Sequence, residues 1–151
     1  MLEDFIGVNG LKAKLFEVSS RVVSVKDVGE KVGIPSEDNA KSLLFITPEN
    51  TPVLAVVLGH TRVDTKKLKS VLGVKDVRLA EPREVLEITG YEVGGVPPVS
   101  VYGVKTLLDK QVTKKDLVVC GGGDTMHLLK ISPKEIIEHN EEISVEDIAK
   151  E

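Results

Sequence analysis

Residues 42–58 have the sequence SLLFITPENTPVLAVVL, and this stretch decides the fold. It contains two apolar runs, Ser42–Thr47 and Val53–Leu58, separated by the turn residues Pro48–Pro52. Two short apolar runs joined by such a turn predict an antiparallel β-hairpin. Because apolar residues occupy both faces of each run, we expect other parts of the chain to cover both sides of the sheet.

Signals for further elements surround the hairpin. Helices are predicted at 3–17 (irregular at its glycines), 26–32, 64–72, 81–88, from 132 and at 144–150, with a further short helix capped by Ser36. Strands are predicted at 21–24, 77–79, 99–108 (one or two), 116–120 and 128–131. The helices and strands alternate without a strict βαβ rhythm. We therefore expect a mixed α/β fold: a single compact domain, residues 1–151, around a curved mixed β-sheet with flanking helices.

The composition limits the class of protein. Of 151 residues, 41% are hydrophobic and only 3% aromatic, which predicts an aliphatic core and argues against aromatic platforms for single-stranded nucleic acid. The net charge of −4 and the pI near 5.5 argue against a protein that coats a phosphate backbone. The single cysteine, the lack of a secretory signal and the lack of a membrane-spanning run predict a cytoplasmic protein without membrane association.

Basic residues nevertheless cluster at two places in the sequence. The clusters are Arg62, Lys66, Lys67 and Lys69, and Lys110, Lys114 and Lys115. One interpretation is a solvated surface of mixed charge. The other is a small basic rim that holds the end of a nucleic acid, and the sequence leaves both open.

A loop at Gly90–Pro98 combines three glycines with a proline pair. Glycine permits backbone angles and close approaches that a Cβ would block. Proline fixes φ and removes an N–H group, so the pair limits how the loop moves. The combination predicts a rigid loop that can offer backbone N–H groups to a ligand or to a developing oxyanion.

Several familiar motifs are absent. The dinucleotide-binding fingerprint G-x-G-x-x-G would need glycine at position 126 after Gly121 and Gly123, but Met126 stands there. The P-loop motif is also absent, because no Gly-Lys-Ser/Thr follows the glycines. The three histidines and one cysteine are widely spaced, so neither a zinc site nor another metal or cofactor is expected. Cys120 ends an apolar run and is expected to be a small buried hydrophobe.

Lys41 stands where a short polar helix gives way to the first apolar run. Its stem could lie along apolar surface with the charged end in solvent. Alternatively, it could hold a point charge near a cavity, suited to a phosphate or to a polarised carbonyl group.

Taken together, these pieces resemble the YbaK/prolyl-tRNA synthetase editing-domain family. The resemblance is carried by Lys41-Ser42-Leu43-Leu44-Phe45, Arg62-Val63-Asp64 with Lys67-Leu68, Thr89-Gly90-Tyr91 with Gly94-Gly95-Val96 and Pro98, and Gly121-Gly122-Gly123. It extends from about residue 20 to about residue 138, with the motifs in the family's order.

The resemblance implies an aminoacyl-tRNA deacylase that acts in trans on the acceptor end of a mischarged tRNA, most often Cys- or Ala-tRNA for proline. It also implies prolyl-tRNA synthetase as a further partner. It assigns catalysis to Lys41 and to the loop residues Gly94, Gly95 and Val96. The implied substrate-binding residues are Tyr91, Pro97, Pro98, Gly121, Gly122, Gly123, Asp124, His60 and His127. This sequence departs from the family pattern at Val99-Ser100, at His60 and around Asp124 and His127, which bears on the amino acid preferred.

An aminoacyl ester is already activated, so positioning a water and stabilising one oxyanion could suffice for hydrolysis. In this hypothesis the amides near Gly94–Val96 bind the carbonyl oxygen and Lys41 anchors the terminal nucleotide. His60 or His127 could act as a base, or each could be an ordinary surface histidine. Two alternatives stay open: a tRNA-end or nucleotide-binding module without hydrolysis, and a hydrolase of unrelated small esters.

Overall fold

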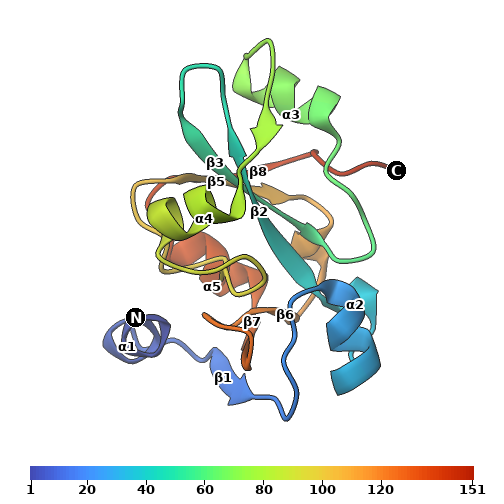
Figure 1. Ribbon diagram of the computed structural model, residues 1–151, viewed down its shortest axis with the longest axis vertical. Coiled ribbons are helices and arrows are strands. Elements are labelled where there is room, and N and C mark those ends of the chain that lie inside the picture. Colours follow the sequence, from blue (N-terminus) through green and yellow to red (C-terminus); the bar gives the residue numbers. More distant parts are fainter.

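The computed structural model describes residues 1–151, and a five-stranded mixed sheet lies at its centre (Figure 1). The strand order is β4-β2-β3-β5-β8, with β2 at Ala40–Ile46, β3 at Pro52–Leu58, β4 at Arg78–Leu79, β5 at Lys105–Asp109 and β8 at Ile143–Glu146. β2 pairs antiparallel with β3 and β4, whereas β5 runs parallel to both β3 and β8. The predicted mixed α/β fold is confirmed.

The β2–β3 hairpin is the predicted one, and both of its faces are buried. Leu44 lies opposite Leu54 and faces the larger of the main hydrophobic cores. Phe45 lies opposite Val53 and faces a second core on the other side of the sheet. Full burial of one such aliphatic side chain contributes about 1.5–3 kcal/mol, so the hairpin is a major part of the stability of both cores.

A second, antiparallel sheet of three strands was not distinguished in the sequence. Its order is β1-β7-β6, with β1 at Lys14–Glu17, β6 at Val118–Gly121 and β7 at His127–Ile131. A single parallel bridge between Asn39 and Val119 connects this sheet to the start of β2.

The helices are short and lie around the two sheets (Figure 1). They are α1 at Leu2–Val8, α2 at Val25–Asp27, α3 at Thr65–Leu72, α4 at Pro82–Thr89 and α5 at Pro133–Glu138, with a π-helical turn at Val28–Val32 and 3₁₀ turns at Ser36–Asp38 and Val112–Lys114. Residues of α4 and α5 contribute to the larger core, and Leu68 of α3 contributes to the second core. The central sheet is therefore covered by helices on both faces.

Three segments differ from the sequence prediction. The helix predicted over 3–17 ends at Val8, and residues 14–17 instead pair with β7 as β1. Residues 21–24 form no strand, although the Val22 N–H bonds to the Thr125 carbonyl at 2.7 Å. The predicted helix at 144–150 is wrong, because residues 143–146 pair with β5. In each case, strand formation depends on whether a segment distant in the sequence pairs with these residues. Local propensity does not reveal such pairing.

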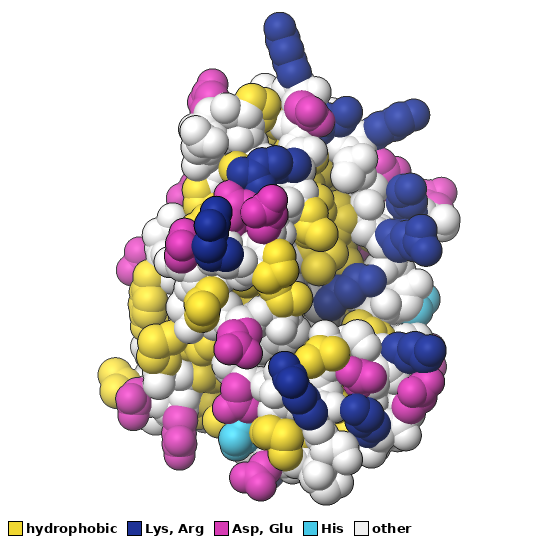
Figure 2. Space-filling model, viewed as in Figure 1, with side chains coloured by type: hydrophobic (Ala, Val, Ile, Leu, Met, Phe, Trp, Pro, Cys, Tyr) yellow, Lys and Arg dark blue, Asp and Glu magenta, His cyan; other side chains and the backbone are white.

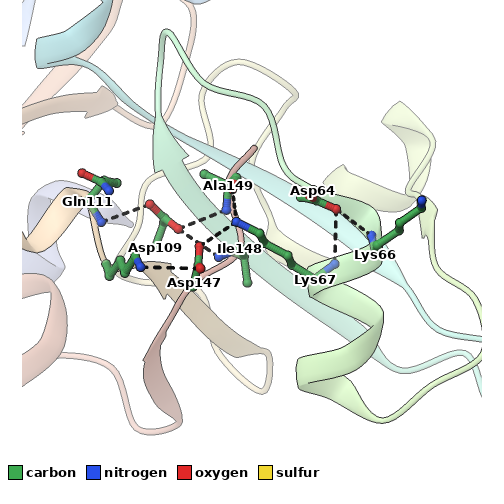
Figure 3. Close-up of polar contacts among 9 residues, drawn as sticks. Asp64, Lys66, Lys67, Asp109, Gln111, Asp147, Ile148 and Ala149 are labelled. Carbon is green, nitrogen blue, oxygen red and sulfur yellow. Dashed lines mark hydrogen bonds and ion pairs between the residues drawn. The ribbon is translucent and has the colours of Figure 1, made fainter. Parts of the chain in front are cut away.

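The segment after β8 is fastened by buried and charged contacts (Figure 3). The buried Asp109 carboxylate accepts the N–H groups of Ile148 at 2.9 Å and Ala149 at 3.1 Å. The Lys67 ammonium donates to Asp147 at 3.1 Å and to the Ala149 carbonyl at 3.0 Å. This contact with Lys67 lowers the pKa of the Asp147 carboxyl.

The same segment also fixes the loop at 59–64. The Asp64 N–H bonds to the Ile148 carbonyl at 2.7 Å, and the Lys150 N–H bonds to the Arg62 carbonyl at 2.8 Å. This loop carries Gly59 and His60 close to the start of β2, so the fastening bears on the geometry of the site described next.

Candidate active site

A cavity of about 520 Å³ lies beside the outer edge of β2. Its lining is mostly apolar and comes from four separate parts of the chain: 22–28, 39–44, 79–96 and 120–128. In Figure 2, hydrophobic side chains gather near the centre of the face, between α4 and α2, and Lys and Arg side chains are frequent along its right-hand side. A largely apolar hollow with a few polar groups is the usual form of a ligand site.

The cavity exists because β2 is only partly paired on its outer edge. β4 pairs with β2 at Phe45 and Ile46, and the bridge from β6 meets it at Asn39. Residues between these points have no strand partner on that side. Lys41 and Leu43 belong to one face of β2, Ser42 and Leu44 to the other, and all four line the cavity. The hollow therefore extends around an open strand edge.

Lys41 contributes a positive charge to this hollow. Its ammonium donates to the Gly59 carbonyl at 3.3 Å, and no carboxylate pairs with it. Burial lowers the pKa of the Lys41 ammonium, and repulsion by the Arg62 guanidinium adds to the effect. A partly desolvated cation without a counter-ion is well suited to hold an anionic or strongly polar group of a ligand.

The glycine–proline loop is anchored by hydrogen bonds and by burial, and its rigidity stays a prediction. α4 ends at Gly90, and the buried Tyr91 hydroxyl lies 2.9 Å from the Ser100 hydroxyl. Pro97 and Pro98 are buried, and the Pro98 carbonyl accepts from the side-chain amide of Asn140 at 2.8 Å. The loop is thus held at both ends by side-chain hydrogen bonds.

The backbone amides of this loop are not equivalent. The Gly95 N–H bonds to the Glu92 carbonyl at 2.9 Å and is already used. The N–H groups of Gly94 and Val96 have no partner, and both residues line the cavity. Gly94 and Val96 are therefore the candidate donors to a ligand, whereas the Gly95 N–H is used within the turn.

The triple glycine packs directly against this loop. A Cβ added at Gly121 would lie 2.6 Å from the Val96 carbonyl oxygen, and one at Gly95 would lie 2.9 Å from the Asp124 nitrogen. The Gly123 N–H bonds to the Gly95 carbonyl at 2.8 Å. Glycine is required here because two backbones are in direct contact. Of the three glycines, only Gly121 lines the cavity.

The two histidines named from the sequence lie outside the cavity lining. His127 Nδ1 is 2.8 Å from the Asp124 carboxylate, and its Nε2 is 3.8 Å from the carboxylate of Glu17. His60 borders a separate shallow depression together with Gly59 and Ser36. Their part in chemistry remains a prediction, as does the catalytic role of Gly95. The binding roles of Tyr91, Pro97, Pro98, Gly122, Gly123 and Asp124 also remain predictions, and none of these residues lines the cavity.

Several lining residues were not identified from the sequence. Val22, Val25 and Val28 carry no signal beyond hydrophobicity, because their segment reaches the site only through tertiary packing. Cys120 also lines the cavity and is buried, as expected of a small hydrophobe. Burial raises the pKa of its thiol, which opposes formation of the thiolate that a nucleophile requires.

No group of three His, Cys, Asp or Glu side chains is arranged to hold a metal ion. None of the helices combines the length and the apolar character that crossing a bilayer requires.

Comparison with known proteins agrees with this fold. The profile of the aminoacyl-tRNA editing domain matches residues 19–138, and the chain belongs to this family. The proline--tRNA ligase of Halalkalibacterium halodurans is 35% identical over 119 residues, which are 79% of this chain and 20% of the ligase. The uncharacterized protein YwhH of Bacillus subtilis is 33% identical over 124 residues, 82% of this chain and 77% of YwhH.

Solved structures extend the similarity over the whole chain. The hypothetical protein APE2540 superposes with a TM-score of 0.90 at 29% identity, covering 99% of both chains. A protein described provisionally as a trans-editing enzyme for prolyl tRNA synthetase superposes with a TM-score of 0.87 at 28% identity, covering 99% of this chain and 95% of that one. The chain spans only about a fifth of the length of the ligases it matches.

Proposed function

We propose that this chain is a trans-acting aminoacyl-tRNA deacylase that removes wrong amino acids from tRNA, with Ala- or Cys-tRNA for proline as the favoured substrates. The observation that carries the proposal is the shared cavity, which is bordered by the unpaired Lys41 ammonium and by the free amides of Gly94 and Val96. Membership of the editing-domain family and the similarity to a trans-editing enzyme for prolyl tRNA synthetase support it.

Each part of the cavity has a task in this proposal. Lys41 anchors the terminal nucleotide of the tRNA by charge. The N–H groups of Gly94 and Val96 bind the ester carbonyl oxygen and stabilise the oxyanion that develops when water attacks. The apolar wall takes the side chain of the amino acid. A hydroxyl of the substrate's own ribose can assist the water, so neither histidine is needed as a base.

The partner implied is the acceptor end of a mischarged tRNA, with prolyl-tRNA synthetase as a further partner that selects the tRNA. The net charge of −4 supports a grip on the tRNA end alone. Binding to tRNA is then weak. Because few phosphates are contacted, the logarithm of the binding constant falls only slightly as the logarithm of the salt concentration rises. A deacylase of this kind acts in the cytoplasm, where translation takes place.

The test is a deacylation assay with alanyl-, cysteinyl-, seryl- and prolyl-tRNA. Wild type should hydrolyse at least one mismatched ester. Lys41→Ala should slow that reaction by about 30- to 1000-fold, which corresponds to a lost interaction of about 2–4 kcal/mol for a partly desolvated charge. Lys134→Ala is the matched control, because Lys134 is highly exposed on α5 and does not line the cavity.

Other outcomes would point elsewhere. Wild-type turnover by Lys41→Ala would remove the anchor role. Tight binding of every mischarged tRNA without loss of ester would favour a non-hydrolytic binding module. Equal activity on free amino-acid esters would favour a small-molecule hydrolase.

A further inference from the structure

The hydroxyl of Ser42 is a polar group without a partner. Its Oγ is buried and forms no hydrogen bond. Two other hydroxyls, those of Thr106 and Ser144, share this property, but only Ser42 lines the cavity. Burying a hydroxyl without a hydrogen bond is unfavourable, so a ligand group that reaches the Ser42 Oγ from the hollow would supply the hydrogen bond that the protein does not.

The backbone around Ser42 is open on the same side. In the β2–β3 ladder, Thr47 bonds to Thr51 and Asn39 bonds to Gly59 through main-chain groups facing β3. Alternation along an antiparallel ladder then directs the N–H and C=O of Ser42 away from β3. They face the stretch of edge between β4 and the Asn39 bridge, where no strand pairs with Ser42.

The rest of the lining offers few acceptors for a donor group. It includes no Asp and no Glu, and its cationic side chains are Lys26 and Lys41. The Ser24 hydroxyl already accepts the Asp27 N–H at 3.1 Å. Asn39 also lines the cavity, and its side-chain amide nitrogen donates to the Pro35 carbonyl at 3.2 Å. The acceptors for an amino group that enters the hollow therefore include the hydroxyl and the strand-edge carbonyl of Ser42 and the side-chain carbonyl of Asn39, but no carboxylate.

We infer that Ser42 binds the α-amino group of the aminoacyl substrate, so that the site selects esters carrying a free α-amino group over esters that lack one. The inference rests on the proposed function, because an aminoacyl ester places its amino group on the carbon next to the reacting carbonyl. With no carboxylate in the lining, an ammonium would be desolvated without a counter-charge. The uncharged amine, which donates to the Ser42 oxygens, is the form bound.

The test uses two amide analogues that resist ester hydrolysis, 3′-alanylamino- and 3′-propionylamino-3′-deoxyadenosine. They differ only in the α-amino group, and their affinities are measured by NMR titration. Wild type should bind the alanyl analogue about three- to tenfold more tightly, as expected for one hydrogen bond. Ser42→Ala should abolish this preference. Ser144→Ala removes an equally buried, unpartnered hydroxyl outside the cavity and should keep it.

Equal affinity of wild type for the two analogues, or an unchanged preference in Ser42→Ala, would overturn the inference. Deacylation of alanyl-tRNA by wild type tests the proposed reaction separately. If wild type deacylates but does not distinguish the analogues, the role of Ser42 fails and the reaction stands. If wild type distinguishes them but hydrolyses no ester, the reaction fails while Ser42 remains an amine-binding residue.

Discussion

Gly121→Ala tests whether the contact between the triple glycine and the glycine–proline loop sets the geometry of the site. The added Cβ would lie 2.6 Å from the Val96 carbonyl oxygen, whereas ordinary van der Waals contacts begin near 3.4 Å. The atoms it meets are backbone, so the loop must move by about 0.8 Å. Overpacking of this kind destabilises a protein by about 1–3 kcal/mol, which lowers Tm by roughly 2–4 °C per kcal/mol in a domain of this size.

The effect on activity should exceed the effect on folding. The displaced residue is Val96, whose free amide is proposed to bind the ester carbonyl oxygen, and a misplacement of about 1 Å can slow a reaction about 100-fold. Deacylation at a temperature well below Tm separates the two effects. Gly7→Ala is the control, since it lies in α1 with nothing within 4 Å of its added Cβ. Wild-type kcat/KM and Tm in Gly121→Ala would refute this account of the loop.

Three further predictions concern stability and reactivity. The hydrogen bond from Arg78 lowers the pKa of Glu84 from 4.5 to about 2. The stability that ionised Glu84 contributes is therefore complete above pH 4.5 and disappears as pH falls to about 2, and the difference between wild type and Glu84→Gln in urea unfolding should follow that course. Asp109→Asn should cost about 1–3 kcal/mol and speed amide hydrogen exchange at Ile148; unchanged exchange would contradict its fastening role. Cys120→Ala should keep deacylation activity, and the native thiol should resist iodoacetamide until the protein unfolds, because burial raises its pKa.

The hairpin could be predicted because its signal is local. Two apolar runs and a proline-flanked turn determine both the pairing of β2 with β3 and the burial of both faces. β8 could not be predicted in this way. Ile143–Glu146 becomes a strand only because β5 offers it a parallel edge, and that edge depends on the whole crossover from β3. The same reasoning explains why residues 14–17 pair with β7 rather than extending α1.

The parts of the site that could be predicted are those in which residue type indicates the backbone conformation or the charge. The glycines and the proline pair of residues 90–98 indicated a stiff loop, and Lys41 stood out at the start of an apolar strand. The distinction between the used amide of Gly95 and the free amides beside it requires coordinates. So does the role of Ser42, since a serine in a strand indicates nothing until its partners are known.

The parallel pairing of β3 with β5 has a consequence for how the chain is synthesised and folded. All of α3, β4, α4 and the glycine–proline loop lie between these two neighbouring strands. Closing so long a connection is slow, because many residues must lose freedom before the non-local contacts form. β8, which completes the sheet, follows every other strand along the chain. A chain still emerging from the ribosome therefore exposes the edge of β5 until Ile143–Glu146 has been made, and the hollow beside β2 takes shape only after β6 and β7 have been made.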